Sequence, residues 1–164
     1  MQVQEVMTGG LVRVCSPEDT LAIAARRLWD HDIGALPVVD REGVVVGMIT
    51  DRDICMGAYT QGRALHEVVV SSVMSHPPRG CRREDALRDV LRRLAEHQFR
   101  RMPVMDERGQ LVGIISLNDI ARAALLFEDA RVPAEEALEA LVEASRPRRR
   151  PMVRVGIADD EAST

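Results

Sequence analysis

The sequence predicts a mixed α/β fold built from two copies of one β-α-β-β-α unit. With Cys15 set against Cys81, a shift of 66 residues, residues 15–54 align with residues 81–120 without a gap. Each copy carries helix-spaced apolar residues, followed by two short apolar runs joined by turn residues. A stacked solenoid needs about three or more repeats. We therefore expect the two copies to pack as a pair about a pseudo-twofold axis, with equivalent clefts for ligands.

Each copy is expected to begin with a short strand and a helix. Residues 11–14 alternate and predict the strand. Ser16, Pro17 and Asp19 supply an N-cap, a proline at the first helical position and an acid at the third, so we expect a helix to begin there. Its apolar stripe is Leu21, Ala24, Ala25 and Leu28, and the second copy repeats it as Leu87, Val90, Leu91 and Leu94. Both stripes should face the core.

A buried hairpin and a second helix complete each copy. Residues 36–39 and 44–49 are nearly continuous apolar runs, and the segment between them contains an Asp and a Gly suited to a turn. Residues 50–53 then open a second helix, as residues 116–119 do in the other copy. The predicted unit is strand, helix, strand, strand, helix.

The copies and their flanks set the expected domain organisation. Residues 1–64 hold the first repeat with an N-terminal segment, and residues 65–127 hold the second, with a short helix around residues 65–69. Pro133 starts a separate helix within residues 128–164. We expect the remainder of that segment to be a flexible tail.

Composition narrows the class of protein. The 164 residues are 46% hydrophobic and 29% charged, enough for a compact domain that folds without disulfides. Three cysteines with no close pair favour a reducing compartment, and no apolar run approaches about 18 residues. We expect a cytoplasmic protein without a membrane anchor. The net charge of -4 argues against wholesale nucleic-acid binding, although residues 146–150 form a local basic run.

Several motifs resemble those of the cystathionine β-synthase (CBS) domain family. They are residues 31–40, His-Asp-Ile-Gly-Ala-Leu-Pro-Val-Val-Asp, followed by Gly43 and by residues 47–54, Gly-Met-Ile-Thr-Asp-Arg-Asp-Ile, and the second copy carries a similar set. With the openings Val-Met-Thr at 6–8 and Val-Met-Ser at 73–75, the likeness covers roughly residues 5–127. It implies a CBS pair, or Bateman module. Such a module binds AMP, ADP, ATP or a similar adenosine ligand and commonly forms a homodimer.

The motif Gly47-x-x-Thr50-x-x-Asp53 supports this chemistry independently. An ionised carboxylate can accept a hydrogen bond from each hydroxyl of a ribose cis-diol, with the threonine hydroxyl nearby, and a helix N-terminus favours an anion. The same spacing also satisfies the helix capping box. The duplication, as Gly113-x-x-Ser116-x-x-Asp119 after an equivalent hairpin, favours ligand binding over capping alone.

Carried over by position, the resemblance implies two clefts, each composed of both copies. The first would hold ribose, phosphate and base through Ser116, Asp119, Arg100, Arg101, Thr8, Ile33 and the backbone near Val12 and Arg13. The second would hold ribose and base through Thr50, Asp53, Ser75, Phe99 and the backbone near Arg79 and Gly80. The predicted ligand-binding set also includes Gly34, Ala35, Pro37 and Pro103.

The two copies differ where Gly34 and Ala35 stand at the positions of Arg100 and Arg101. Guanidinium groups form forked bonds to phosphate, whereas glycine and alanine offer only backbone. This difference predicts that the cleft of Asp119 prefers phosphorylated ligands, and that the cleft of Asp53 tolerates neutral or cationic ones.

The expected function is that of a regulatory sensor, not an enzyme. The sequence has no nucleophile motif, metal-ligand pattern or phosphate loop, and His31 and His97 are interpreted as helix C-terminal residues. We expect no required cofactor, a homodimer formed through apolar helix surfaces such as residues 121–126, and a regulated protein of unknown identity. Two alternatives stay open: a protein-interaction module with empty clefts, or a nucleic-acid-binding regulator. The choice of adenosyl ligand also stays open.

Overall fold

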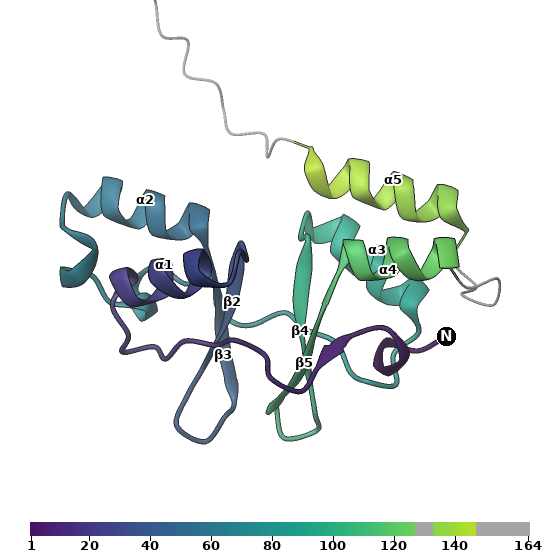
Figure 1. Cartoon of the computed structure of the whole chain (residues 1–164), viewed down its shortest axis with the longest axis horizontal. Helices are drawn as coiled ribbons and strands as arrows, with labels where there is room; N and C mark the ends of the chain where they lie inside the picture. The colour runs from purple at the N-terminus through teal and green to yellow at the C-terminus, as the bar shows by residue number, and fades with distance from the viewer. Residues whose placement is uncertain (127–132, 147–164) are drawn as a thin grey trace, which may run out of the picture.

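The computed structural model describes residues 1–126 and 133–146 and consists of two similar halves that lie side by side (Figure 1). The N-terminal segment runs along the second half. Phe127 and the tail from residue 147 onward, both included in our domain predictions, lie outside the described residues.

The predicted helix-strand-strand-helix order is confirmed in both halves. The first half contains α1 (Leu21–Asp30), β2 (Ala35–Val39), β3 (Val45–Thr50) and α2 (Asp51–Gln61). The second contains α3 (Leu87–His97), β4 (Arg101–Met105), β5 (Leu111–Ser116) and α4 (Leu117–Leu126). The predicted C-terminal helix is α5 (Ala134–Ser145), and the short elements are η1 (Val3–Glu5), β1 (Thr8–Gly9), η2 (Leu65–Glu67) and η3 (Val70–Ser72).

The start of the first repeat differs from the sequence-based expectation. Residues 11–14 form no strand, and the nearest pairing is a single parallel bridge between Cys15 and Val38. The helix does not begin at Ser16, because α1 starts at Leu21 with Thr20 as its N-cap. The Asp19 carboxylate instead accepts hydrogen bonds from the Ser16 N–H, at 2.9 Å, and from Arg27. The pattern that resembled a helix start therefore closes a turn.

A pseudo-twofold axis passes between the tips of the two hairpins. Val44 and Gln110, which are equivalent residues of the two copies, form an antiparallel bridge with each other. The Val45 N–H donates to the Gly109 carbonyl at 3.0 Å, and the Leu111 N–H donates to the Gly43 carbonyl at 3.2 Å. Only at such an axis can equivalent positions pair with one another. The expected pseudo-symmetry is confirmed.

The segment that precedes each repeat in sequence packs on the other repeat. Strand β1 pairs with β5 through Thr8 and Ile114, and the Val3 N–H donates to the Asp85 carbonyl at 3.0 Å. Likewise, Ser75 bridges Met48 of β3, and the Val70 N–H donates to the Asp19 carbonyl at 2.8 Å. The packing units therefore differ from the units of the sequence repeat.

Each half has its own apolar core, and the exchanged segments contribute to both. Val68 and Val70 belong to the core of the first half, and Val3 belongs to that of the second. The second core also includes Ala137, Ala140 and Ala144 of α5, which packs on α3 and α4. No helix within the described ranges is long and apolar enough to cross a membrane.

Candidate functional site

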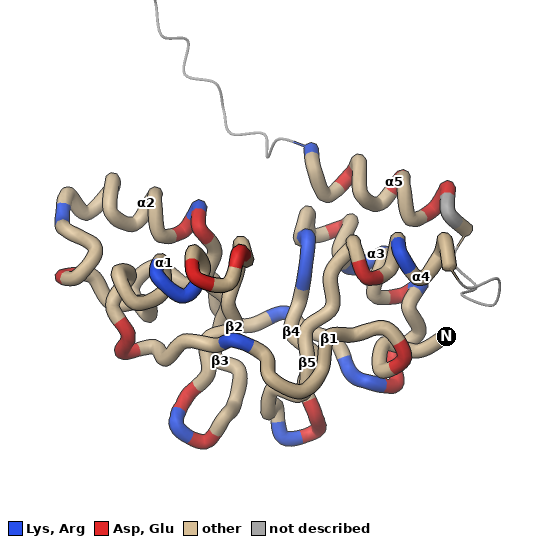
Figure 2. The backbone as a smooth tube through the Cα atoms, in the orientation of Figure 1, with Lys and Arg blue, Asp and Glu red and all other residues tan. Residues whose placement is uncertain are grey.

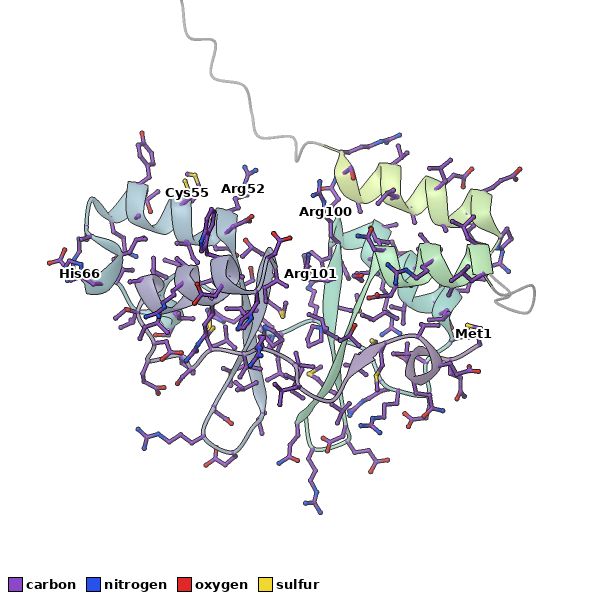
Figure 3. The ribbon with its side chains drawn as sticks, viewed as in Figure 1. Met1, Arg52, Cys55, His66, Arg100 and Arg101 are labelled. Carbon is purple, nitrogen blue, oxygen red and sulfur yellow. The ribbon has the colours of Figure 1, made fainter. Side chains whose placement is uncertain are left out.

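A cleft of about 850 Å³ lies between the two halves, where the start of α2 faces the start of β4 (Figure 3). We call it the Asp53 cleft. Its volume lies within the range of about 300–1,000 Å³ that is usual for small-molecule sites. Its main polar side chains are Thr50, Asp51, Arg52, Asp53, Ser75, His76, Arg79, Gln98, Arg100, Arg101, Ser145 and Arg146.

The ribose candidates Thr50 and Asp53 form a capping box at the first turn of α2. The Asp53 Oδ2 atom accepts hydrogen bonds from the Thr50 N–H at 2.9 Å and from the Thr50 hydroxyl at 2.7 Å. The Thr50 hydroxyl oxygen accepts in turn from the Asp53 N–H at 3.1 Å. Capping therefore occupies Oδ2, and no residue that the structure describes donates to Oδ1. One carboxylate oxygen stays available to a ligand.

Ser116 and Asp119 have the same geometry at the start of α4. Asp119 Oδ2 accepts from the Ser116 N–H at 2.8 Å and from the Ser116 hydroxyl at 2.6 Å. Neither residue lines the Asp53 cleft. The two motifs are thus equivalent in local structure, and they face different surroundings.

Arg100 and Arg101 line the Asp53 cleft, whereas the sequence analysis grouped them with Asp119. Arg101 is the first residue of β4 and Arg100 precedes it, and the Arg101 side chain reaches Gly34 of the other half. A Cβ atom added to Gly34 would lie 3.9 Å from Nη2 of Arg101 and 3.7 Å from Oδ2 of Asp51. The small Gly34-Ala35 pair therefore leaves room for the arginine of the opposite repeat.

The equivalent backbone positions keep one shared role despite this side-chain difference. The Gly34 carbonyl accepts from the Asp51 N–H at 3.3 Å, and the Arg100 carbonyl accepts from the Leu117 N–H at 2.9 Å. Both carbonyls tie the segment before a hairpin to the start of the following helix. The backbone is therefore conserved between copies, and only the charge at the cleft differs.

The structure brings half of the predicted site residues together. Nine of them line the Asp53 cleft: Gly34, Ala35, Thr50, Asp53, Ser75, Arg79, Phe99, Arg100 and Arg101. The other predicted residues lie outside its lining: Thr8, Val12, Arg13, Ile33, Pro37, Gly80, Pro103, Ser116 and Asp119. Among these, the Pro37 and Pro103 carbonyls accept backbone hydrogen bonds from Cys15 and Cys81 at 3.0 and 3.1 Å. Their visible role is therefore structural.

The lining also contains charged residues that the sequence analysis did not assign to a ligand site. Asp51 and Arg52 lie between Thr50 and Asp53 of the ribose motif, so their adjacency to Asp53 was a usable signal. Arg146 follows α5, outside both repeats, and no repeat equivalence could have placed it at the cleft. Of the basic run at residues 146–150, only Arg146 lies within the described residues.

A second hollow, of about 540 Å³, lies between α1 and α2. Its walls are mainly apolar, and we call it the α1–α2 groove. It is lined by Ala25, Leu28, Trp29, Asp32, Ile33, Gly34, Asp51, Ile54, Cys55 and Leu65. Trp29 is 88% exposed at this groove, so a large apolar ring faces solvent. Ile33, which we predicted to contact a base in the cleft of Asp119, is part of the lining of this groove.

The equivalent cysteines Cys15 and Cys81 are buried in the two cores. Burial raises the pKa of each thiol to about 12, so both stay protonated near neutral pH. Within the described ranges, no three His, Cys, Asp or Glu residues gather as metal ligands. The charged residues that line the Asp53 cleft, two carboxylates and five guanidinium groups, are suited to holding a polar anionic molecule.

Comparisons with known proteins agree with this geometry. The family model described as "CBS domain" matches residues 3–57 and 70–126. A relative in Bacillus subtilis (strain 168), the CBS domain-containing protein YhcV, is 40% identical over 128 residues, which are 78% of this chain and 89% of that protein.

Solved structures give the same result. The crystal structure of CBSX2 in complex with AMP has a TM-score of 0.68 and 31% identity, covering 76% of this chain and 96% of that one. The CBS domain pair of protein MJ0100, in complex with 5-methylthioadenosine and S-adenosyl-L-methionine, has a TM-score of 0.63 and 25% identity, covering 74% and 98%.

Two family matches, one on each repeat, coincide with the two halves and their exchanged openings. The relative in Bacillus subtilis is matched over most of its own length, and the solved pairs have the same arrangement of repeats. The chain therefore belongs to the CBS domain family, as a tandem pair of CBS domains.

Proposed function

We propose that the protein is a regulatory sensor that binds an adenosine-containing ligand in the Asp53 cleft and performs no catalysis. The observation that carries this proposal is the Asp53 carboxylate, which lines a cleft of nucleotide size and is held by the capping box through Oδ2, while no described residue donates to its Oδ1 atom. An ionised carboxylate oxygen can accept from both hydroxyls of a ribose. The AMP-bound and S-adenosylmethionine-bound relatives support the same class of ligand.

The other parts of a nucleotide have candidate partners in the same lining. Phe99 offers a ring that can pack on an adenine base. Arg100 and Arg101 offer forked donors to phosphate oxygens, and the N-terminus of α2 adds a partial positive charge. The protein would take this ligand from the cytoplasmic pool of adenine nucleotides. The proposed function requires no cofactor.

Calorimetric titration with adenosine, AMP, ADP, ATP, 5′-methylthioadenosine and S-adenosylmethionine tests the proposal. Asp53→Ala should weaken the bound compound about tenfold to a hundredfold, because hydrogen bonds to a charged group contribute about 1.5–3 kcal/mol. Asp30→Ala, which removes an exposed carboxylate outside the cleft, is the matched control. If folded wild type and folded Asp53→Ala bind the compound with equal affinity, Asp53 acts only as a helix cap.

We further propose that the signal is transmitted through a homodimer formed at the α1–α2 groove. An apolar hollow beside an exposed tryptophan is more typical of a contact surface than of a solvated one. Trp29 is the single tryptophan of the chain, so its fluorescence reports this surface alone. Dimerisation should shift its emission to shorter wavelength as concentration rises. Light scattering that gives 18.2 kDa with and without nucleotide would contradict the dimer.

A further inference from the structure

Helix α5 belongs to neither repeat, yet its last turn lines the Asp53 cleft. Ala137, Ala140 and Ala144, at helical spacing, are buried against α3 and α4. At the opposite end of α5, Glu136 accepts from Arg88 of α3 at 2.9 Å. These contacts hold the helix along the second half, with its C-terminal end toward the centre of the molecule (Figure 1). Ala144, Ser145 and Arg146 consequently form part of the cleft wall.

The cleft is positively charged within a negatively charged protein. Its lining contains five arginines and two aspartates, whereas the whole chain has a net charge of -4. Figure 2 shows blue segments at the start of α2, the start of β4 and the end of α5, on different sides of the central space. Among described residues, Arg52, Arg100 and Arg101 take part in no ion pair. Because the guanidinium groups outnumber the carboxylates of the lining and these three form no ion pair, the cleft favours a ligand with several negative charges.

Arg146 can join these groups because its present partner holds it weakly. Its Nη1 atom lies 3.0 Å from Glu143 Oε2, in an i,i+3 pair whose side chains are 64% and 42% exposed. Exposed pairs of this kind stabilise a protein by about 1 kcal/mol or less. Arg146 is also the C-cap residue of α5, where the helix carries a partial negative charge. Its guanidinium offsets that charge at the cleft wall and makes the end of α5 compatible with phosphate.

From these contacts we infer that Arg146 binds the terminal phosphates of a nucleoside di- or triphosphate held in the Asp53 cleft. The inference rests on the proposed function and specifies its ligand: a polyphosphate whose ribose lies at Asp53 and whose outer phosphates extend toward α5. Arg52 stands at the start of α2, and Arg100 and Arg101 stand at the start of β4 (Figure 3). Arg146, at the end of α5, supplies a donor from the third side of the lining. Helix α5 is accordingly part of the ligand site.

Calorimetry with adenosine, AMP, ADP and ATP on wild type and Arg146→Gln tests this role. Wild type should bind ATP more tightly than AMP, and the difference should shrink as salt rises. Arg146→Gln should weaken ATP and ADP about tenfold, the loss of one charge-assisted contact, and leave AMP and adenosine within about twofold. The matched control is Arg26→Gln, an exposed helical arginine paired with Asp30 at 3.4 Å and outside the cleft. This control should leave the affinities for all four compounds unchanged.

Two results would overturn the inference while leaving the proposed function intact. One is unchanged ATP affinity in Arg146→Gln, and the other is an equal loss for AMP and ATP. If no adenosine compound binds to wild type, the proposed function fails, and titration with inorganic tripolyphosphate then decides the role of Arg146. Binding of tripolyphosphate that Arg146→Gln weakens supports a polyphosphate site. Binding that the variant leaves unchanged, or no binding to wild type, overturns it.

Discussion

In the second repeat α5 covers the outer face of α3 and α4, whereas the equivalent face of α1 and α2 is open. The residues at that face differ accordingly. Leu94 is fully buried in the core that includes the alanines of α5, whereas its equivalent Leu28, 6% exposed, lines the α1–α2 groove. Trp29 is 88% exposed, and the equivalent position in the second repeat is the half-buried Ala95. Duplication has preserved the backbone of the unit, and its two outer surfaces have acquired different environments.

The cleft side of the two repeats differs in the same way. Gly34-Ala35 and Arg100-Arg101 occupy equivalent positions with the same backbone hydrogen bond to the next helix. The small pair leaves space and the arginine pair supplies charge, so both contribute to one asymmetric cleft. In a pseudo-symmetric molecule, substitution on one side of the axis is enough to make one cleft cationic.

The largest difference between the repeats should appear in their cores. Leu94→Ala should destabilise the protein by about 3–5 kcal/mol, because the substitution would leave a cavity in the closed core that also contains the alanines of α5. Leu28→Ala should cost nearer to about 2 kcal/mol, because its site opens to the α1–α2 groove. Urea denaturation of both variants measures the difference. Equal losses would mean that α5 adds little to the burial of Leu94.

The cleft asymmetry should appear as ligand selectivity. The double variant Arg100→Ala, Arg101→Ala should weaken AMP by about 1.5–3 kcal/mol, or roughly tenfold to a hundredfold, and leave adenosine within about twofold. Since these arginines line the cleft of Asp53, Asp119→Ala should leave the phosphate-dependent site intact. Calorimetry on the three proteins decides the grouping. If Asp119→Ala removes phosphate binding instead, Arg100 and Arg101 act together with Asp119, as the sequence analysis expected.

Close packing of the exchanged segments can be compared at two equivalent glycines. A Cβ atom at Gly47 would lie 2.8 Å from the Ser75 carbonyl oxygen, and one at Gly113 would lie 3.0 Å from that of Thr8. We expect Gly47→Ala to cost about 2–3 kcal/mol and Gly113→Ala about 1–2 kcal/mol, the usual range for overpacking. Gly9→Ala, whose nearest neighbour would be 3.7 Å away, is the control. Thermal or urea denaturation measures these losses. If Gly9→Ala destabilises the protein as much as Gly47→Ala and Gly113→Ala do, the close contacts at Gly47 and Gly113 are not the cause.

The smallest expected effect concerns an acid-dependent ion pair. Burial acts to raise the pKa of Asp85, but hydrogen bonds from Arg93 and the Arg82 backbone outweigh it and hold that pKa below its ordinary value. A depressed carboxyl pKa stabilises the fold above the unfolded-state pKa, and this stabilisation is lost as pH falls through the folded-state pKa. Asp85→Asn should therefore cost about 1 kcal/mol or less at pH 7.

Urea denaturation at pH 7 and under acid conditions shows whether the stabilisation by Asp85 decreases as pH falls. The difference between wild type and Asp85→Asn should disappear as acid protonates Asp85. Asp89→Asn, which removes an exposed carboxylate from the first turn of the following helix α3, is the control. A difference that persists in acid would show that Asp85 acts through its shape and hydrogen bonds and not through its charge.

Local patterns predicted most of the fold. The hairpins and helices follow from apolar periodicity and turn residues, and a Thr or Ser with an Asp three residues later starts both α2 and α4. The helix start at Ser16 was wrong because the Asp19 carboxylate can cap a helix or close a turn, and contacts from Ser16 and Arg27 decide between them. Sequence alone does not supply those contacts.

The site was less predictable, because it depends on which surfaces meet. Thr50, Asp53, Ser75 and Phe99, which the sequence analysis placed in one cleft, line one cleft in the structure, since each follows from a motif or its repeat. The placement of Arg100 and Arg101 depends on the pseudo-twofold axis. Arg146 depends on the path of α5, which no repeat specifies.

The exchange of opening segments bears on how the chain unfolds and on how it arose. Strand β1 lies on β5, and Ser75 lies on β3, so each half contains a segment that its neighbour's sequence supplies. Neither half can lose its structure without exposing an edge of the other, which favours a single cooperative transition. A chain with only one repeat would need a second copy to donate the missing segment. An ancestral pair of identical chains with swapped ends, later fused into one polypeptide, would preserve every one of these contacts.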